Sequence, residues 1–173
     1  MPFTPYHMGP GILFKALLQG SFSLMVFGWA QVMMDLQPLI AIVSENGRLH
    51  GFSHTYLGAT IIAIFSAGTG KYLAQWALVN IIRLRPVVFI GWLVAFLSAF
   101  IGTYSHVILD SIMHGDVQPW FPFSASNNLL GLASVQTLHK LCLYGGLVGT
   151  VSYFIIARIL RGREIADKPS RQA

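Results

Sequence analysis

The sequence predicts an all-α membrane protein, a polytopic helix bundle made of an N-terminal helical hairpin and about three transmembrane helices. Of its 173 residues, 54% are hydrophobic and only 10% are charged, whereas about a quarter of the residues in a soluble domain carry a charge. Several apolar runs approach the roughly 20 residues that a helix needs to cross a hydrocarbon core of about 30 Å. Basic residues cluster beside these runs, which is typical of membrane-crossing helices.

The first apolar region, residues 11–34, fits two arrangements, because four polar residues interrupt it: Lys15, Gln19, Ser21 and Ser23. One straight span would put His7 and Asp35 roughly 40 Å apart, at about 1.5 Å per residue. A hairpin that turns at QGSFS would instead return His7 to the side of Asp35. We favour the hairpin, because Lys15 is awkward inside a full span and could snorkel or pair near a turn.

Three further apolar segments complete the predicted bundle: residues 54–82, 86–109 and 141–160. The chain shows no internal repeat, so we expect a single membrane-embedded domain over residues 1–161 and a polar, disordered tail over residues 162–173. The N-terminal stretch MPFTPYHMGPGILF lacks the basic start of a signal peptide, and we expect it to remain in the mature protein.

Small residues spaced four apart occur twice in these segments. Ser98 with Gly102, and Gly145 with Gly149, form the small-xxx-small pattern that lets helices approach closely. We interpret both pairs as helix-packing faces without a role in chemistry.

The basic residues set the predicted orientation. Arg83 and Arg85 lie between two spans, and a second group follows the last span: Arg158, Arg161, Arg163, Lys168 and Arg171. The positive-inside rule places both groups in the cytoplasm, and the predicted loops 35–53 and 105–140 then lie on the outer face. We expect a multi-pass protein of a bacterial-type plasma (inner) membrane with a cytoplasmic C-terminus. This placement also explains the net charge of +5 without a nucleic-acid partner.

The scarce ionisable residues gather at the outer ends of the predicted spans. Six of them lie there: His50, His54, His106, Asp110, His114 and Asp116. His106 and Asp110 are four residues apart and share one helix face. An Asp at the centre of a spanning helix costs about 2.5 to 3.5 kcal/mol, so it is expected to have a partner. Asp35 can join the same face, and so can His7 if the hairpin forms.

These residue types point to a metal site. The single cysteine, Cys142, excludes a disulfide within the chain and a Cys-rich metal site. Any metal must therefore be held by imidazole and carboxylate, which suit zinc and related divalent ions. The same pattern also fits a buried ion pair between His106 and Asp110.

Several neighbouring residues keep more than one interpretation. His50 can be a ligand, a group that supports a ligand, or a solvated loop residue. His114 and Asp116 can be a catalytic acid and base, extra ligands, or polar loop residues, and we select them as the catalytic candidates. His139 is more simply a contact between helices than a ligand. Lys140 can hold a phosphate or extend to the interface.

A loop near these residues is rich in aromatic side chains: Trp120, Phe121 and Phe123. Such residues commonly form a belt at the membrane surface. They can also shape a mouth that faces lipid.

Four sequence blocks within residues 1–123 resemble one known family. They are MPFTPYHMGPGILF, MMDLQP, HGFSHT, and SHVILD followed by a loop that ends in WFP. The chain resembles the YdjM-like membrane-bound metal-dependent hydrolases, which are distantly similar to zinc-dependent phospholipase C and the S1/P1 nucleases. The resemblance implies metal ligands at five positions: His7, Asp35, His54, His106 and Asp110.

The chain departs from the family pattern in three places. Gln37 replaces a second acid, the run before His54 is shortened around His50, and His139 is followed four positions later by Leu143 instead of Glu. A centre with three metal ions is therefore not expected.

Together, the residues and the resemblance lead to one functional hypothesis. We expect a membrane-bound hydrolase in which one or two zinc ions, held by the five positions and His50, activate water for attack on a phosphoester. A site at the membrane face points to a phospholipid or another lipid-linked phosphate as the substrate. The alternative is a metal-binding or ion-translocating membrane protein without hydrolytic chemistry. Haem ligation by facing histidines is a third possibility.

Overall fold

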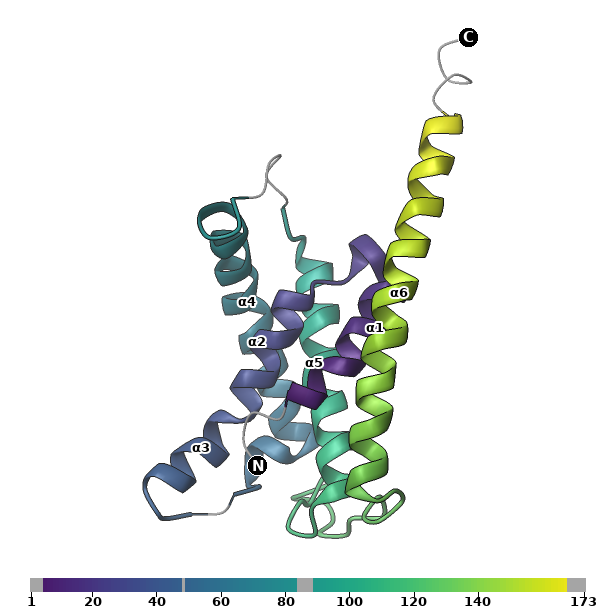
Figure 1. Ribbon diagram of the computed structural model, residues 1–173. Helices are drawn as coiled ribbons and strands as arrows, with labels where there is room; N and C mark the ends of the chain where they lie inside the picture. The colour runs from purple at the N-terminus through teal and green to yellow at the C-terminus, as the bar shows by residue number, and fades with distance from the viewer. Residues whose placement is uncertain (1–4, 48, 84–88, 168–173) are drawn as a thin grey trace.

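The computed structural model describes residues 5–47, 49–83 and 89–167, and within these ranges it is entirely helical, without a strand. The predicted all-α fold is thus confirmed. Six α-helices and three short 3-10 turns follow one another (Figure 1): η1 Pro5–His7, α1 Met8–Leu18, η2 Gln19–Ser21, α2 Leu24–Met34, α3 Leu36–Val43, η3 Phe52–His54, α4 Tyr56–Asn80, α5 Trp92–Met113 and α6 Val135–Asp167.

The first apolar region is the hairpin, not a single span. α1 and α2 are its arms, and polar groups hold the turn between them. Lys15 Nζ donates to the carbonyls of Gln19, at 2.6 Å, and of Phe22, at 2.8 Å. Ser23 caps α2, because its hydroxyl accepts the backbone N–H of Val26 at 3.4 Å. Lys15 and Ser23, two of the polar residues that disfavoured a single span, therefore stabilise the turn of the hairpin.

Four segments are long and apolar enough to cross a membrane: Leu24–Val43, Tyr56–Asn80, Trp92–Met113 and Val135–Arg163. The first differs from expectation, because residues 35–53 were predicted to be a loop. Instead α3 follows α2 after a break at Asp35 and runs at an angle to it (Figure 1). Pro38 is tolerated because it lies in the first turn of α3, where an N–H would have no helical partner.

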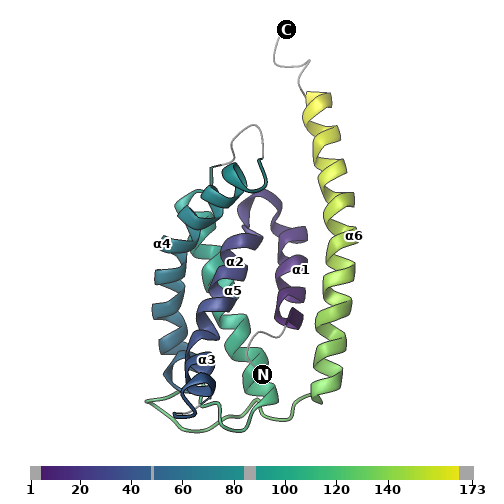
Figure 2. The same cartoon turned by 60° about the vertical axis from the view of Figure 1, so that its left-hand side comes forward.

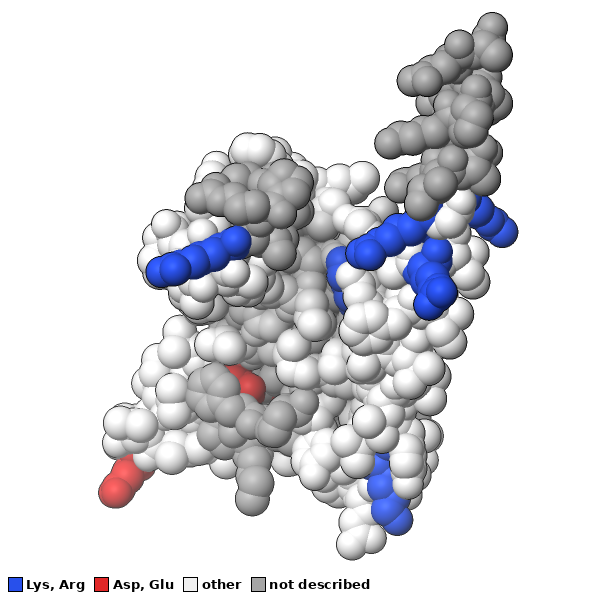
Figure 3. Space-filling view, turned by 45° about the horizontal axis from the view of Figure 1, so that its top comes forward, with Lys and Arg blue, Asp and Glu red and all other residues white. Residues whose placement is uncertain are grey.

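α6 also exceeds the predicted segment 141–160. It begins at Val135 and continues through Asp167, so the helix extends into the predicted polar tail. The rest of that tail, residues 168–173, lies outside the described residues. Lys and Arg side chains gather mainly at the end of the molecule where α6 ends (Figure 3), as the orientation hypothesis requires.

Small side chains form the core between α2, α4 and α5. The buried cluster includes Ala30, Ala63, Ala67, Ala95 and Ala99, all fully buried. Because alanine lets helix backbones approach closely, the three helices pack tightly. α1 lies on the other side of α5 and contacts α6 along its length, so that α1 joins α6 to the bundle (Figure 2).

The glycines explain this close approach of α1 and α6. A Cβ at Gly149 would come within 2.7 Å of the Leu13 backbone nitrogen, and a Cβ at Gly9 would collide with the Cys142 carbonyl. Gly102 similarly faces Ala30 and Phe27 of α2. The predicted packing faces at Gly102 and Gly149 are present, but Gly145 faces open space.

The two glycines of α6 provide a stability test. Gly149→Ala should lower the stability of the protein in detergent by about 1 to 3 kcal/mol, because the added methyl group overpacks the contact with α1. Gly145→Ala is the matched control on the same helix, and should be neutral or stabilising by up to about 1 kcal/mol. Thermal unfolding of both variants measures the difference. Equal melting temperatures would contradict the described packing.

Candidate metal centre

Four separate elements bring five ionisable side chains to one end of the bundle. His7 ends η1, Asp35 lies at the break between α2 and α3, and His54 ends η3. His106 and Asp110 lie on the last turns of α5. The hairpin is essential, since it returns His7 to the end of the bundle where Asp35 lies.

The local sequence around His54 fixes its backbone. Thr55 caps α4, because its hydroxyl accepts the backbone N–H of Gly58 at 2.9 Å. A Cβ at Gly58 would collide with the Phe52 carbonyl, so glycine allows η3 to fold tightly against the start of α4. His54 is consequently directed into the bundle and is fully buried.

The carboxylate of Asp110 is the centre of the cluster. Its Oδ2 lies 3.1 Å from the Nε2 atoms of both His54 and His106, and its Oδ1 lies 3.5 Å from His7 Nε2. His106 Nε2 also lies 3.5 Å from Asp35 Oδ1. All five side chains are buried, with residue exposures of 6% or less. Three imidazoles and two carboxylates therefore share a site from which water is largely excluded.

A glutamine determines how His106 presents its nitrogens. Gln31 Nε2 donates to the Gly102 carbonyl at 3.0 Å, so Gln31 Oε1 is the atom that faces His106 Nδ1, at 2.6 Å. An amide oxygen only accepts hydrogen bonds, so Nδ1 of His106 carries a proton. In a neutral ring Nε2 then bears the lone pair, and it points at the two carboxylates.

The buried nitrogens of this cluster show that the residues fit a metal ion. Nε2 of His54, Nε2 of His106 and both ring nitrogens of His7 have no hydrogen-bond partner of acceptable geometry among the described residues. Lone pairs that face carboxylate oxygens repel them unless a proton or a cation lies between. The cluster can hold a metal ion in two overlapping groups of donor atoms, His7–His106–Asp110 and Asp35–His54–His106. A protonated His106 is the alternative way to satisfy the same geometry.

Burial favours the neutral forms of His7 and His54. Desolvation by burial, together with repulsion from His106, lowers the pKa of His7 from 6.5 to about 4. Burial also lowers the pKa of His54, against the opposing effect of Asp110. Neutral imidazole is the form that binds a metal, so at neutral pH both rings are suited to ligation.

A second group of ionisable side chains lies beside the first and closer to solvent. His50 Nδ1 lies 2.9 Å from both carboxylate oxygens of Asp116, and its ring stacks on His114 at 4.4 Å. His50 also contacts His54 edge-on, with ring centroids 4.9 Å apart. Burial disfavours the charged form of Asp116, but the hydrogen bond with His50, the charges of His50 and His114 and a backbone hydrogen bond together lower the pKa of Asp116. His50 thus connects the two groups.

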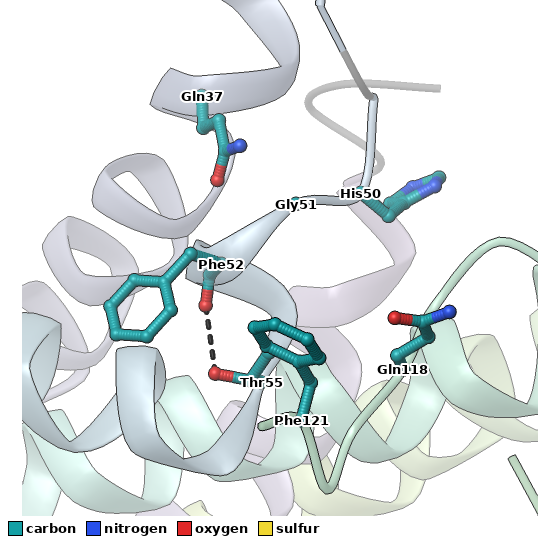
Figure 4. Close-up of a pocket in the computed structure, with 7 residues that line it drawn as sticks. All are labelled: Gln37, His50, Gly51, Phe52, Thr55, Gln118 and Phe121. Atoms are coloured by element: carbon teal, nitrogen blue, oxygen red, sulfur yellow. Dashed lines mark hydrogen bonds between the residues drawn. The ribbon is translucent and has the colours of Figure 1, made fainter. Parts of the chain in front are cut away.

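A cavity of about 290 Å³ opens next to His50. Its walls combine the aromatic rings of Phe52 and Phe121 with the amides of Gln37 and Gln118 (Figure 4). Gln37 Oε1 accepts the backbone N–H of Ser53 at 2.9 Å. Gln37 thus supports the loop around His54.

The structure brings together all eight residues selected from the sequence: His7, Asp35, His50, His54, His106, Asp110, His114 and Asp116. His139 stands apart, with its ring stacked on Tyr6 at 4.3 Å. Sequence analysis missed Gln31 and also Ser53, whose hydroxyl lies 2.9 Å from His54 Nδ1. For Gln31 a signal was present, because it is an amide in an apolar helix four residues before Asp35.

Removing the Gln31 amide should weaken metal binding. Gln31→Leu leaves His106 Nδ1–H without an acceptor, and the loss of such a supporting partner typically costs about 10- to 100-fold in metal affinity. Gln75→Leu is the matched control on α4, away from the cluster. Zinc titrations of metal-free protein in detergent measure both affinities. An unchanged affinity in Gln31→Leu would show that this contact does not orient a ligand.

The depressed pKa of His7 predicts a pH-dependent stability of the metal-free protein. The unfolded chain gains a proton on His7 below about pH 6.5, whereas the folded chain gains it only near pH 4. The contribution of His7 to the free energy of unfolding should therefore fall by about 3 kcal/mol as the pH drops across this interval. His7→Phe should lose less stability than the wild type over the same interval. Thermal unfolding against pH measures this, and parallel curves would refute the assignment.

Comparisons with protein families, with curated proteins and with solved structures find no significant match for this chain. The resemblance to the YdjM-like hydrolases stays a prediction from the sequence blocks.

Proposed function

We propose that the protein is a membrane-bound, metal-dependent hydrolase that cleaves a phosphoester at the outer face of a bacterial-type plasma membrane. One observation carries this proposal: three buried imidazoles converge on the Asp110 carboxylate, with nitrogens that have no hydrogen-bond partner among the residues the structure describes. Five positions of the family resemblance coincide with this cluster, which supports the same activity.

The proposed roles follow from the donor atoms. His7, His106 and Asp110 would hold one ion, and Asp35, His54 and His106 form the alternative set of donors. These ligands favour Zn²⁺, which is bound by imidazole nitrogen and carboxylate oxygen. When bound, such an ion supplies Lewis acidity that brings the pKa of water to about 7 and polarises a phosphoryl oxygen. Gln31 and Ser53 orient the imidazoles, and burial excludes bulk water.

The surroundings of the site support a lipid-linked substrate. The cavity beside His50 is lined by Phe52 and Phe121, and the nearby side chains of Trp120 and Phe123 are 53% and 87% exposed. An amphipathic substrate could place its phosphate toward the histidines and its apolar part along these rings. None of the described residues that line this cavity is Lys or Arg, so neutralisation of a phosphate would depend on the metal centre.

The proposed orientation follows from charge. Arg158, Arg161 and Arg163 lie in the C-terminal part of α6, away from the cluster, and the positive-inside rule assigns that end to the cytoplasm. The centre then faces the outer side, where it can meet lipid headgroups. A cytoplasmic C-terminus is part of this proposal.

The test is a direct comparison of metal content and hydrolysis. Asp110→Asn keeps the shape of the side chain but removes its charge, so it should lose the bound metal and reduce phosphoesterase activity more than about 100-fold, beyond the effect of removing a supporting residue. Elemental analysis and a screen of phosphomonoesters, phosphodiesters and phospholipid vesicles measure both. His139→Ala is the control histidine variant and should retain both properties.

The same preparation separates the two functional classes. Metal retention with no hydrolysis across the screen, together with zinc flux into proteoliposomes, would contradict the hydrolase and favour ion translocation. Retention of metal by Asp110→Asn at the wild-type level would contradict the metal centre itself.

A further inference from the structure

The outer group of His50, His114 and Asp116 lies beside the cluster at Asp110, and His50 also belongs to a donor group with His54 and Asp110. His50 lies in the loop before η3, His114 is the C-cap of α5, and Asp116 follows two residues later. Each offers a nitrogen or an oxygen that lies within 4.8 Å of the other two. The side chain of Asp116 is 54% exposed, and that of His50 is 8% exposed. Unlike the deep cluster, this group reaches solvent, through Asp116.

An ion pair explains only part of this arrangement. The contact between His50 Nδ1 and Asp116, at 2.9 Å, is sufficient to hold those two side chains together. It does not account for His114, whose ring nitrogens have no hydrogen bond to any residue that the structure describes. His114 is instead positioned by its backbone: its N–H donates to the Asp110 carbonyl at 2.8 Å, and Asn127 Nδ2 donates to its carbonyl at 3.3 Å.

The electrostatics of the group suit a cation. Two imidazole rings stacked at 4.4 Å would repel each other if both were protonated. Asp116 supplies a negative charge at the same place. Two imidazoles and one carboxylate, with a side open to water, form a donor set that zinc-type ions accept.

We propose that His50, His114 and Asp116 form a second divalent-cation site, beside the deep cluster and open to solvent on the side of Asp116. Solvent completes its coordination, so its ion exchanges more readily than an ion held by the buried ligands. This site does not depend on the hydrolase assignment, because it requires only that these three side chains bind a cation.

The experiment counts bound ions in the full-length, untagged protein purified in detergent. Equilibrium dialysis against Zn²⁺ alone, followed by elemental analysis, should show a weakly held ion that brief chelation removes and added Zn²⁺ restores. His114→Ala should lose that ion, one per chain, and keep the ions that resist chelation. Asp116→Asn should weaken the same ion at least tenfold.

His139→Ala is the matched control, because this histidine lies at the same end of the bundle without belonging to either group. It should bind as many ions as the wild type. Circular dichroism verifies that each variant is folded. We expect all of them to fold, because His114 and Asp116 lie after the last residue of α5. Three results would overturn the proposal: no exchangeable ion in the wild type, wild-type stoichiometry in His114→Ala, or loss of the chelation-resistant ions from folded His114→Ala.

Discussion

The burial of the Asp110 carboxylate is the constraint on which the rest of this structure depends. An ionised carboxylate within a membrane-spanning helix is costly and needs a compensating partner. Here the Nε2 atoms of His54 and His106 lie 3.1 Å from the same Asp110 oxygen, and a proton or a metal ion between them would supply the compensating charge. His7 ends η1 and His54 ends η3, and both contact Asp110 of α5. These contacts therefore also hold the N-terminal segment and the start of α4 against α5.

The helical hairpin and the small residues serve the same end. A single span over residues 11–34 would separate His7 from Asp35 by the thickness of the membrane, whereas the turn held by Lys15 brings both to one face. Close packing of α1 against α6 keeps that short arm in place, although α1 is too short to cross a bilayer. Stability of the bundle and assembly of the site are thus coupled through the N-terminal arm.

Sequence analysis predicted the helical membrane fold and the hairpin, and it selected the eight ionisable residues of the site. It could do so because hydropathy, charge placement and helical spacing are local signals. It failed where the determining contact is long-range. Gln31 and His106 are 75 residues apart in sequence, and no local pattern connects an amide on one helix to an imidazole on another. α3 was missed because it is short and contains Pro38, which reads as a loop residue unless it falls in a first helical turn.

The most direct measurement of the central claim is X-ray absorption spectroscopy of the zinc retained by the purified protein. The account predicts a first shell of nitrogen and oxygen atoms at about 2.0 to 2.2 Å, with the outer-shell scattering of imidazole rings and no sulfur, since His and Asp are the proposed ligands. A sulfur shell near about 2.3 Å, or a spectrum without imidazole scattering, would contradict it.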